Sequence, residues 1–166
     1  MIRKIINKKI RTIEDQFHVN ITIDNMQCNI QIEDTAGQDD YKSMFDKWVN
    51  ENDGFILVYS IDNEESFNSI KERVDKIKIY KEFTDTIIVA GNKKDLELEN
   101  KRKIGRAAAE KYCQENKLKF IECSAKSGEN CRDVFIEAGR LLLKKKYPFK
   151  YNIIKDDGSK GCCNIF

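Results

Sequence analysis

Residues 28–38, Cys-Asn-Ile-Gln-Ile-Glu-Asp-Thr-Ala-Gly-Gln, form a strand pattern that runs into a polar end. Cys28, Ile30 and Ile32 alternate with polar residues, and side chains in a strand point alternately to its two faces. The pattern predicts a half-buried β-strand that ends near Asp34.

The polar end of this stretch carries groups that suit a phosphate and a cation. A carboxylate such as Asp34 can hold Mg²⁺ through water, and Gly37 can bring a backbone N–H against a phosphate. Gln38 can orient an attacking water. The alternative is a polar turn with an incidental glutamine.

The residues before this stretch form a second alternating pattern. Residues 17–23 alternate in the same way, and a turn at 24–26 joins the two patterns, which predicts a β-hairpin. His18 falls on its outward face, where a solvated side chain is expected. The hairpin would allow Thr12 and Asp34 to stand at the same edge of one site.

The rest of the chain alternates between short apolar runs and amphipathic segments. Predicted strands cover residues 54–60, 86–90 and 119–122, and predicted helices cover residues 41–50, 66–81, 105–116 and 131–146. The alternation predicts an α/β fold, a mostly parallel sheet with helices on both faces. Ligands of such sheets bind at the carboxyl ends of the strands.

Composition limits the classes of protein that fit. The 166 residues are 40% hydrophobic, which suits one domain, residues 1–146, followed by a flexible tail, residues 147–166. A net charge of only +2 gives no reason to expect nucleic acid. Six cysteines without a C-x-x-C pair predict a reducing compartment. The apolar runs are too short to span a bilayer.

Two loops that follow predicted strands carry groups suited to a purine base. The first, Gly-Asn-Lys-Lys-Asp, ends at Asp95, whose carboxylate can accept from two adjacent N–H donors, which guanine offers and adenine does not. Asn92 can bond to the base and brace a neighbouring loop. The aliphatic stem of Lys93 can cover a ring face.

The second loop, Cys-Ser-Ala-Lys at residues 123–126, follows the last predicted strand. A backbone N–H at Ala125 can meet the guanine oxygen, and Ser124 can hold Asp95 in place. By itself this loop is an ordinary turn. Its significance comes from occurring together with the other loops, in this order and each after a predicted strand.

From Thr12 to about Lys146 the sequence resembles the Ras branch of small GTPases, which have the small G domain of the P-loop NTPase class. The resemblance implies that Thr12 is the switch I threonine that ligates Mg²⁺ and senses the γ-phosphate. It also implies an effector-binding segment, which comprises Lys9, Ile10, Arg11, Thr12, Ile13, Glu14, Asp15, Gln16 and Phe17.

The resemblance assigns the remaining site residues as well. Gln38 is the catalytic, water-orienting residue, and Asp34 binds Mg²⁺ through water. Nucleotide-binding residues are Asp34, Thr35, Ala36, Gly37, Asn92, Lys93, Asp95, Ser124, Ala125 and Lys126. The implied ligands are GTP or GDP with Mg²⁺, and the implied partners are effectors at both switches, an exchange factor and a GTPase-activating protein.

One family motif is missing from the 166 residues: no Gly-x-x-x-x-Gly-Lys-Ser/Thr occurs. The family's first strand and most of its first helix are accordingly expected to be absent. Losing four charge-assisted bonds to phosphate removes about 6–12 kcal/mol, or about four to nine decades of affinity. One hypothesis is a GTPase whose phosphate loop is encoded upstream of Met1. The alternative is a nucleotide-free, prenylated interaction module or the inactive product of a degraded gene.

The C-terminus ends in Cys-Asn-Ile-Phe, a C-a-a-X box whose cysteine is Cys163. Phe166 favours a geranylgeranyl group, which a prenyltransferase would add, and Cys162 can take a palmitoyl group. Scattered lysines can strengthen contact with an anionic leaflet. These features predict attachment to the cytoplasmic face of a membrane, the plasma membrane. The alternative is a cysteine pair at a disordered end.

Overall fold

The computed structural model describes residues 14–35, 42–81, 84–148, 151 and 161–165. The chain divides into two compact units, residues 1–53 with 139–166 and residues 54–138. Among the described residues each unit contains a three-stranded sheet. The α/β class predicted from the sequence is confirmed.

The first unit is built on the predicted hairpin. Strands β1 (Glu14–Ile23) and β2 (Met26–Thr35) pair antiparallel with Ile23 opposite Met26. The two residues between them, Asp24 and Asn25, have positive φ angles of 46° and 65°. Two-residue loops of this kind match the twist of the flanking strands, and Asn and Asp tolerate them. His18 is exposed on β1, as the alternation predicts.

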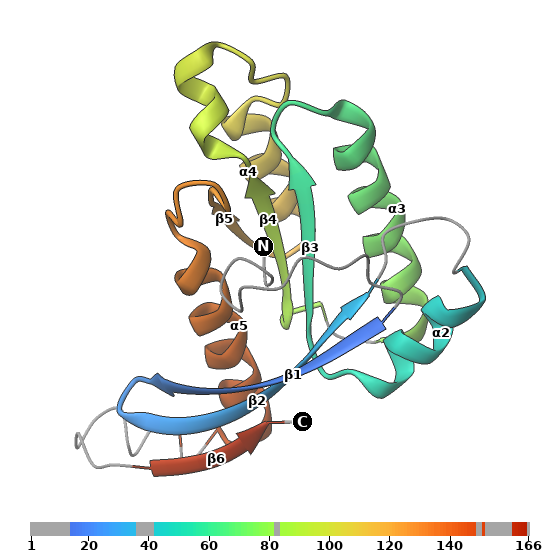
Figure 1. The fold of residues 1–166 in the computed structure, drawn as a ribbon. Helices are drawn as coiled ribbons and strands as arrows, with labels where there is room; N and C mark the ends of the chain where they lie inside the picture. The colour runs from blue at the N-terminus through green and yellow to red at the C-terminus, as the bar shows by residue number, and fades with distance from the viewer. Residues whose placement is uncertain (1–13, 36–41, 82–83, 149–150, 152–160, 166) are drawn as a thin grey trace. The chain divides into compact units, whose positions relative to one another are not determined.

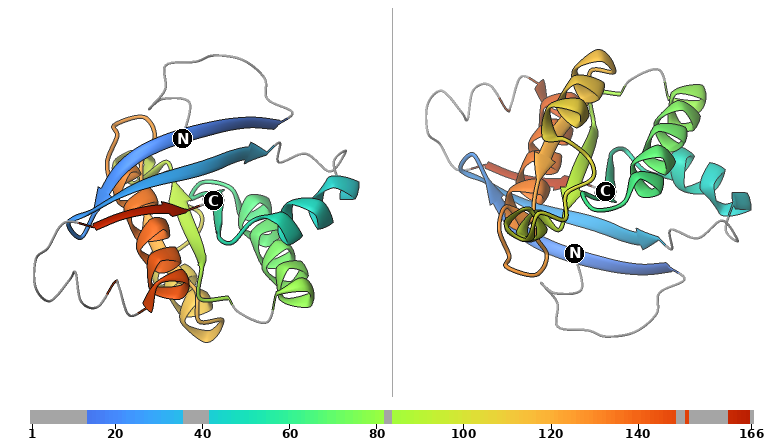
Figure 2. Two further views of the ribbon diagram at one scale, coloured as in Figure 1. Left: turned by 90° about the horizontal axis from the view of Figure 1, so that it is seen from below. Right: turned by 90° about the horizontal axis from the view of Figure 1, so that it is seen from above.

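A third strand, β6 (Gly161–Ile165), completes the sheet of the first unit. It runs parallel to β2 along Met26–Ile30, on the edge that β1 leaves open (Figures 1 and 2). This strand was not predictable from the sequence, because five residues with Gly161 at their start give no alternating pattern.

The second half of helix α5 (Cys131–Lys146) packs on the hairpin within the first unit. A Cβ atom at Gly139 would lie 2.3 Å from Ile23 Cδ1 and 2.9 Å from Ile30 Cδ1, so the helix approaches the strands closely there. Leu143, about one helical turn after Gly139, is fully buried. Helix α2 (Lys42–Glu51) belongs to the same unit and buries Val49.

The second unit contains the parallel sheet that the sequence predicts. Its strands are β3 (Phe55–Ser60), β4 (Ile87–Asn92) and β5 (Lys119–Glu122), in the order β3-β4-β5. Helices α3 (Glu64–Tyr80) and α4 (Arg106–Glu115) contact β3 and β5 respectively. The short helix η2 (Lys94–Glu99) directly follows β4.

Burial in this sheet differs between the strands. The central strand β4 is buried from Ile87 to Gly91, as its continuous apolar run predicts. The same prediction for β3 is wrong in part, because Val58 is 43% exposed and Phe55 is only half-buried. Among the described residues β3 pairs with β4 on one edge only, and this leaves its other edge without a strand to cover it.

Four cysteines are buried: Cys28, Cys113, Cys123 and Cys131. Cys28 lies in β2, Cys113 in α4 and Cys131 at the start of α5, and Cys123 directly follows β5. Three of the four therefore lie in regular elements, and all four belong to the core. Among the described residues no helix is both long enough and apolar enough to cross a bilayer.

Candidate functional site

The two base-binding loops predicted from the sequence meet at the carboxyl ends of β4 and β5. These strands are parallel neighbours, so the chain leaves both of them at the same edge of the sheet. The backbone N–H of Cys123 donates to the Gly91 carbonyl at 2.8 Å, and that of Lys94 donates to the Cys123 carbonyl at 3.0 Å. The two loops are therefore joined through their backbones.

Asn92 joins the loops a second time through its side chain. Its Oδ1 accepts from the Ala125 N–H at 3.0 Å and from the Lys93 N–H at 2.8 Å. The predicted brace between the loops is thus present. The same bond engages the Ala125 N–H that the sequence analysis assigned to a base oxygen, so that contact requires an exchange of hydrogen bonds.

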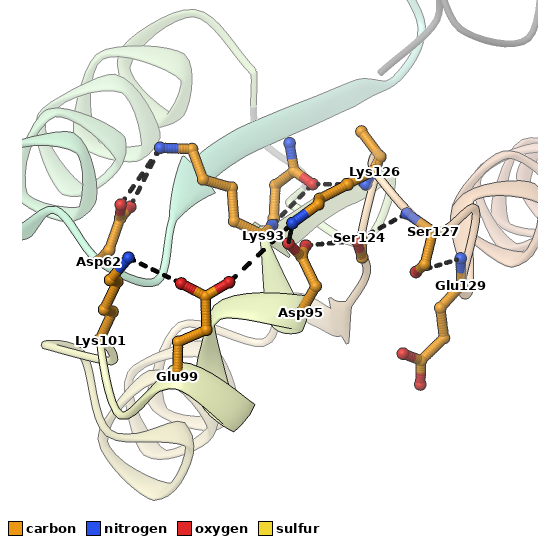
Figure 3. Close-up of polar contacts among 11 residues, drawn as sticks. Asp62, Lys93, Asp95, Glu99, Lys101, Ser124, Lys126, Ser127 and Glu129 are labelled. Atoms are coloured by element: carbon orange, nitrogen blue, oxygen red, sulfur yellow. Dashed lines mark hydrogen bonds and ion pairs between the residues drawn. The ribbon is translucent and has the colours of Figure 1, made fainter.

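Asp95 is held from the second loop by Ser124, as the sequence predicts. The buried Ser124 hydroxyl donates to Asp95 Oδ1 at 2.5 Å and accepts from the Ser127 N–H at 3.1 Å (Figure 3). Lys126 Nζ lies 3.6 Å from Asp95 Oδ2. The Ser124 bond, with a smaller contribution from the Lys126 charge, lowers the pKa of Asp95. The carboxylate therefore stays ionised and acceptor-only at neutral pH.

Lys93 is positioned by its backbone and by an acidic partner. It adopts the left-handed conformation, with φ 66° and ψ 34°, and its ammonium lies 3.2 Å from Asp62 Oδ1. Figure 3 shows the aliphatic stem of Lys93 extended from its backbone to the Asp62 carboxylate. A hydrogen bond from Ser60 and the contact with Lys93 lower the pKa of Asp62. The stem is held extended, which suits it to cover a flat ring.

A buried ion pair lies behind the second loop. Arg102 donates from Nη1 to Glu122 Oε1 at 2.7 Å and from Nη2 to Oε2 at 3.1 Å. The Glu122 side chain is 3% exposed, and the Glu122 carbonyl accepts from Asn130 Nδ2 at 2.8 Å. The bond to Glu122 raises the pKa of Arg102 above its ordinary value, against the opposing effect of burial. The pair fixes the residue from which the second loop departs.

Sequence reasoning missed Asp62 and the Arg102–Glu122 pair. Asp62 follows β3 by two residues, and a polar residue near the carboxyl end of a strand is the feature that drew attention to Asp34, so a signal was available. Arg102 lies in an irregular segment, and its partner is 20 residues away. Nothing in the local pattern identifies such a pair.

The other predicted residues lie elsewhere or outside the described part of the chain. Asp34 and Thr35 end β2 in the first unit, with Asp15 opposite Asp34, and the hypothesis that Asp34 shares the rim of the base loops stays a prediction. Residues Glu14 to Phe17 begin β1. Outside the described residues lie Lys9, Ile10, Arg11, Thr12, Ile13, Ala36, Gly37 and Gln38.

Removing the Ser124 hydroxyl tests the cause of the Asp95 shift. Because the folded-state pKa of Asp95 is lowered, its contribution to stability is present above the ordinary pKa and is lost as pH falls through the folded value. In Ser124→Ala we expect the pKa to rise towards the ordinary value, as measured by NMR titration of the carboxyl carbon. The free energy of unfolding should then fall less steeply as the pH is lowered into the acid range. An unchanged pKa would assign the shift to Lys126 instead.

The assembled loops offer one chemistry clearly: an ionised acceptor, the Asp95 carboxylate, on a fixed frame beside the aliphatic stem of Lys93. This suits a flat heterocycle with two adjacent N–H donors. A protein-family model described as the Ras family matches residues 2–144. The matched span includes both loops and every strand except β6.

Proposed function

The chain belongs to the Ras family, and from this premise we propose that it is a membrane-anchored signalling switch that responds to guanine nucleotides. The observation that carries the proposal is the Asp95 carboxylate held by Ser124 on a frame that Asn92 braces. The family supports a small-GTPase function, and this frame supports selection of guanine.

Base selection follows from the ionisation state of Asp95. An ionised carboxylate accepts both N–H donors of guanine, whereas adenine presents an acceptor at the equivalent edge and would be repelled. Lys126 neutralises part of the charge from outside, at 3.6 Å from Oδ2. Lys93 would cover one face of the ring with its stem. We expect guanine nucleotides to bind and adenine nucleotides not to.

The phosphate and Mg²⁺ side of the proposal depends on Asp34, Thr12 and Gln38. Asp34 lies opposite Asp15 in the β1–β2 register, and cross-strand partners point to the same face. Mg²⁺ prefers oxygen ligands such as carboxylates, so the Asp34 side chain suits the ion. The described residues contain no cluster of three or more metal-binding side chains. Gln38 would orient the attacking water.

Membrane attachment is proposed from the tail. Cys163 would carry a geranylgeranyl group added by a prenyltransferase, and Cys162 a palmitoyl group. One lipid chain anchors only marginally, so two would be needed to hold the protein at the plasma membrane. Effectors, an exchange factor and a GTPase-activating protein are proposed as partners of the switch segments.

A specific sequence feature favours a second candidate function. Residues 1–166 contain no Gly-x-x-x-x-Gly-Lys-Ser/Thr, so the lysine and the backbone donors that hold phosphates in the family have no counterpart among them. The second candidate is a prenylated interaction module that works without nucleotide.

Nucleotide titration of the purified 166-residue chain separates the two candidates. We expect GDP with Mg²⁺ to shift the amide NMR signals of Ala125 and Lys94, with a dissociation constant above about 1 μM because the phosphate contacts are few. ADP serves as the control. Equal shifts with both nucleotides, or none with GDP at millimolar concentration, would contradict the first candidate. The intact mass of the protein from cells reports the start site and the lipid.

A further inference from the structure

The C-terminal segment that carries both tail cysteines is a strand of the first unit. In β6 the register places Gly161 opposite Met26 and Ile165 opposite Ile30. Parallel strands bond through alternate backbone groups, so the backbone of Cys162 and Cys163 takes part in a ladder with β2. The edge of a β-sheet can bind an extended segment through main-chain hydrogen bonds.

The start of the tail is anchored at the same end of the hairpin. The Tyr151 hydroxyl donates to Asp24 Oδ2 at 2.6 Å, and Arg140 donates to both carboxylate oxygens of Asp24 at 2.7 Å. Asp24 precedes Met26 by two residues, in the tight turn that joins β1 to β2. The anchor therefore lies close to the point where β6 begins.

The connection between anchor and strand has a suitable length. Nine residues, 152–160, join Tyr151 to Gly161. Nine residues reach at most about 30 Å when fully extended, so the chain length allows Gly161 to lie beside Met26. Because Tyr151 and Gly161 are joined by so few residues, docking is an intramolecular event, for which effective concentrations in the millimolar range are typical. A weak strand-to-strand interaction is enough to keep the tail on β2.

We propose that the edge of β2 from Met26 to Ile30 is a docking site for the chain's own C-terminal strand, and that docking withholds Cys163 from prenylation. The second half rests on the proposed function. In prenylation the Cys163 sulfur bonds to C1 of geranylgeranyl diphosphate, diphosphate leaves, and the thiol proton passes to solvent. A transferase must enclose the terminal residues, which it cannot do while their backbone pairs with β2.

The register provides a test of docking that is independent of any lipid. Cys163 is opposite Cys28, and Cys162 is opposite Gln27. Paired residues of neighbouring strands share a face, and strands about 4.8 Å apart fall within the range that a disulfide spans. Neighbouring residues of one strand point to opposite faces. Cys163 can therefore be linked to Cys28, whereas Cys162 cannot.

Mild oxidation of the full unmodified chain with diamide tests this register. Two thiols lose two protons and two electrons to the reagent and form one disulfide. We expect Cys162→Ser, which keeps Cys163, to give a Cys28–Cys163 link within the chain, mapped by mass spectrometry. The matched variant Cys163→Ser should give at least tenfold less Cys28–Cys162 link. Equal yields, no link in either variant, or links between two chains would overturn docking in cis.

Withholding is tested by the rate of geranylgeranylation in vitro. If about nine in ten chains are docked, the free peptide 152–166 should react about tenfold faster than the full chain at equal concentration. Gly161→Pro removes an N–H from β6 without touching the C-a-a-X box, and should bring the full chain near the peptide rate. Gly158→Pro, which lies before β6, is the control and should leave the rate of the full chain unchanged.

The outcomes separate the two proposals. Equal rates for peptide and full chain, or equal rates for the two proline variants, would overturn withholding. If neither peptide nor chain is modified, the proposed prenylation fails and withholding fails with it. The disulfide experiment would still decide whether β6 docks on β2.

Discussion

Asp95→Asn is expected to bind GDP about 10- to 150-fold more weakly than the unaltered chain. The substitution keeps the shape of the side chain and its contact with Ser124, but removes the negative charge and places an N–H₂ against the donors of guanine. Losing one charge-assisted bond costs about 1.5–3 kcal/mol, which is the stated range of affinity. The measurement is an NMR titration of the Ala125 amide with GDP.

Glu99→Gln is the matched control for that variant. The Glu99 carboxylate lies 4.0 Å from the Lys126 ammonium, which also contacts Asp95. It accepts a hydrogen bond from Lys101, and in the described structure no hydrogen bond joins it to the second loop. Its neutralisation should change GDP affinity less than twofold. If both variants weaken GDP binding equally, general electrostatics and not contact with the base would explain the role of Asp95.

Arg102→Met is expected to destabilise the second unit by about 3–5 kcal/mol. The change leaves the Glu122 carboxylate buried at 3% exposure without its bidentate partner, and breaking a buried pair costs this much. Amide hydrogen exchange of β4 reports the second unit alone. Protection there should fall by about two to four decades.

Two further variants show whether the pair itself is responsible. Arg106→Met breaks an exposed pair with Glu110 on α4, where the side chains are 61% and 39% exposed, and should cost less than about 0.5 kcal/mol. The double variant Arg102→Met with Glu122→Leu removes both charges and should recover most of the lost protection. A double variant as unstable as Arg102→Met would assign the loss to packing.

Regular elements of this chain were predictable because their signals are local. The hairpin follows from alternation on both sides of Asp24 and Asn25, whose residue types suit positive φ. Strand β5 and helix α5 have the bounds that the periodicity predicts, and α2, α3 and α4 agree within two residues, whereas the short helix η2 was not predicted. The frame of the base loops was predictable for the same reason, since Asn92 is the last residue of β4 and Asp95 follows it by three residues.

The features that sequence did not reveal depend on partners far along the chain. β6 forms because β2 has an open edge beside it, and its own five residues carry no periodic signal. The exposure of Val58 depends on what covers β3, which its apolar run cannot report. The same holds for Arg102, which lies 20 residues from Glu122, and for the exchange that Ala125 must make with Asn92.

The buried cysteines have a practical consequence for labelling. Burial raises the pKa of Cys113 to about 11 and that of Cys123 to about 12. At pH 7 only about one Cys113 thiol in ten thousand is the nucleophilic thiolate, and fewer still for Cys123. Maleimide dyes should therefore leave these two sites unmodified in the native protein, and a dye that does react with them reports that the second unit has opened.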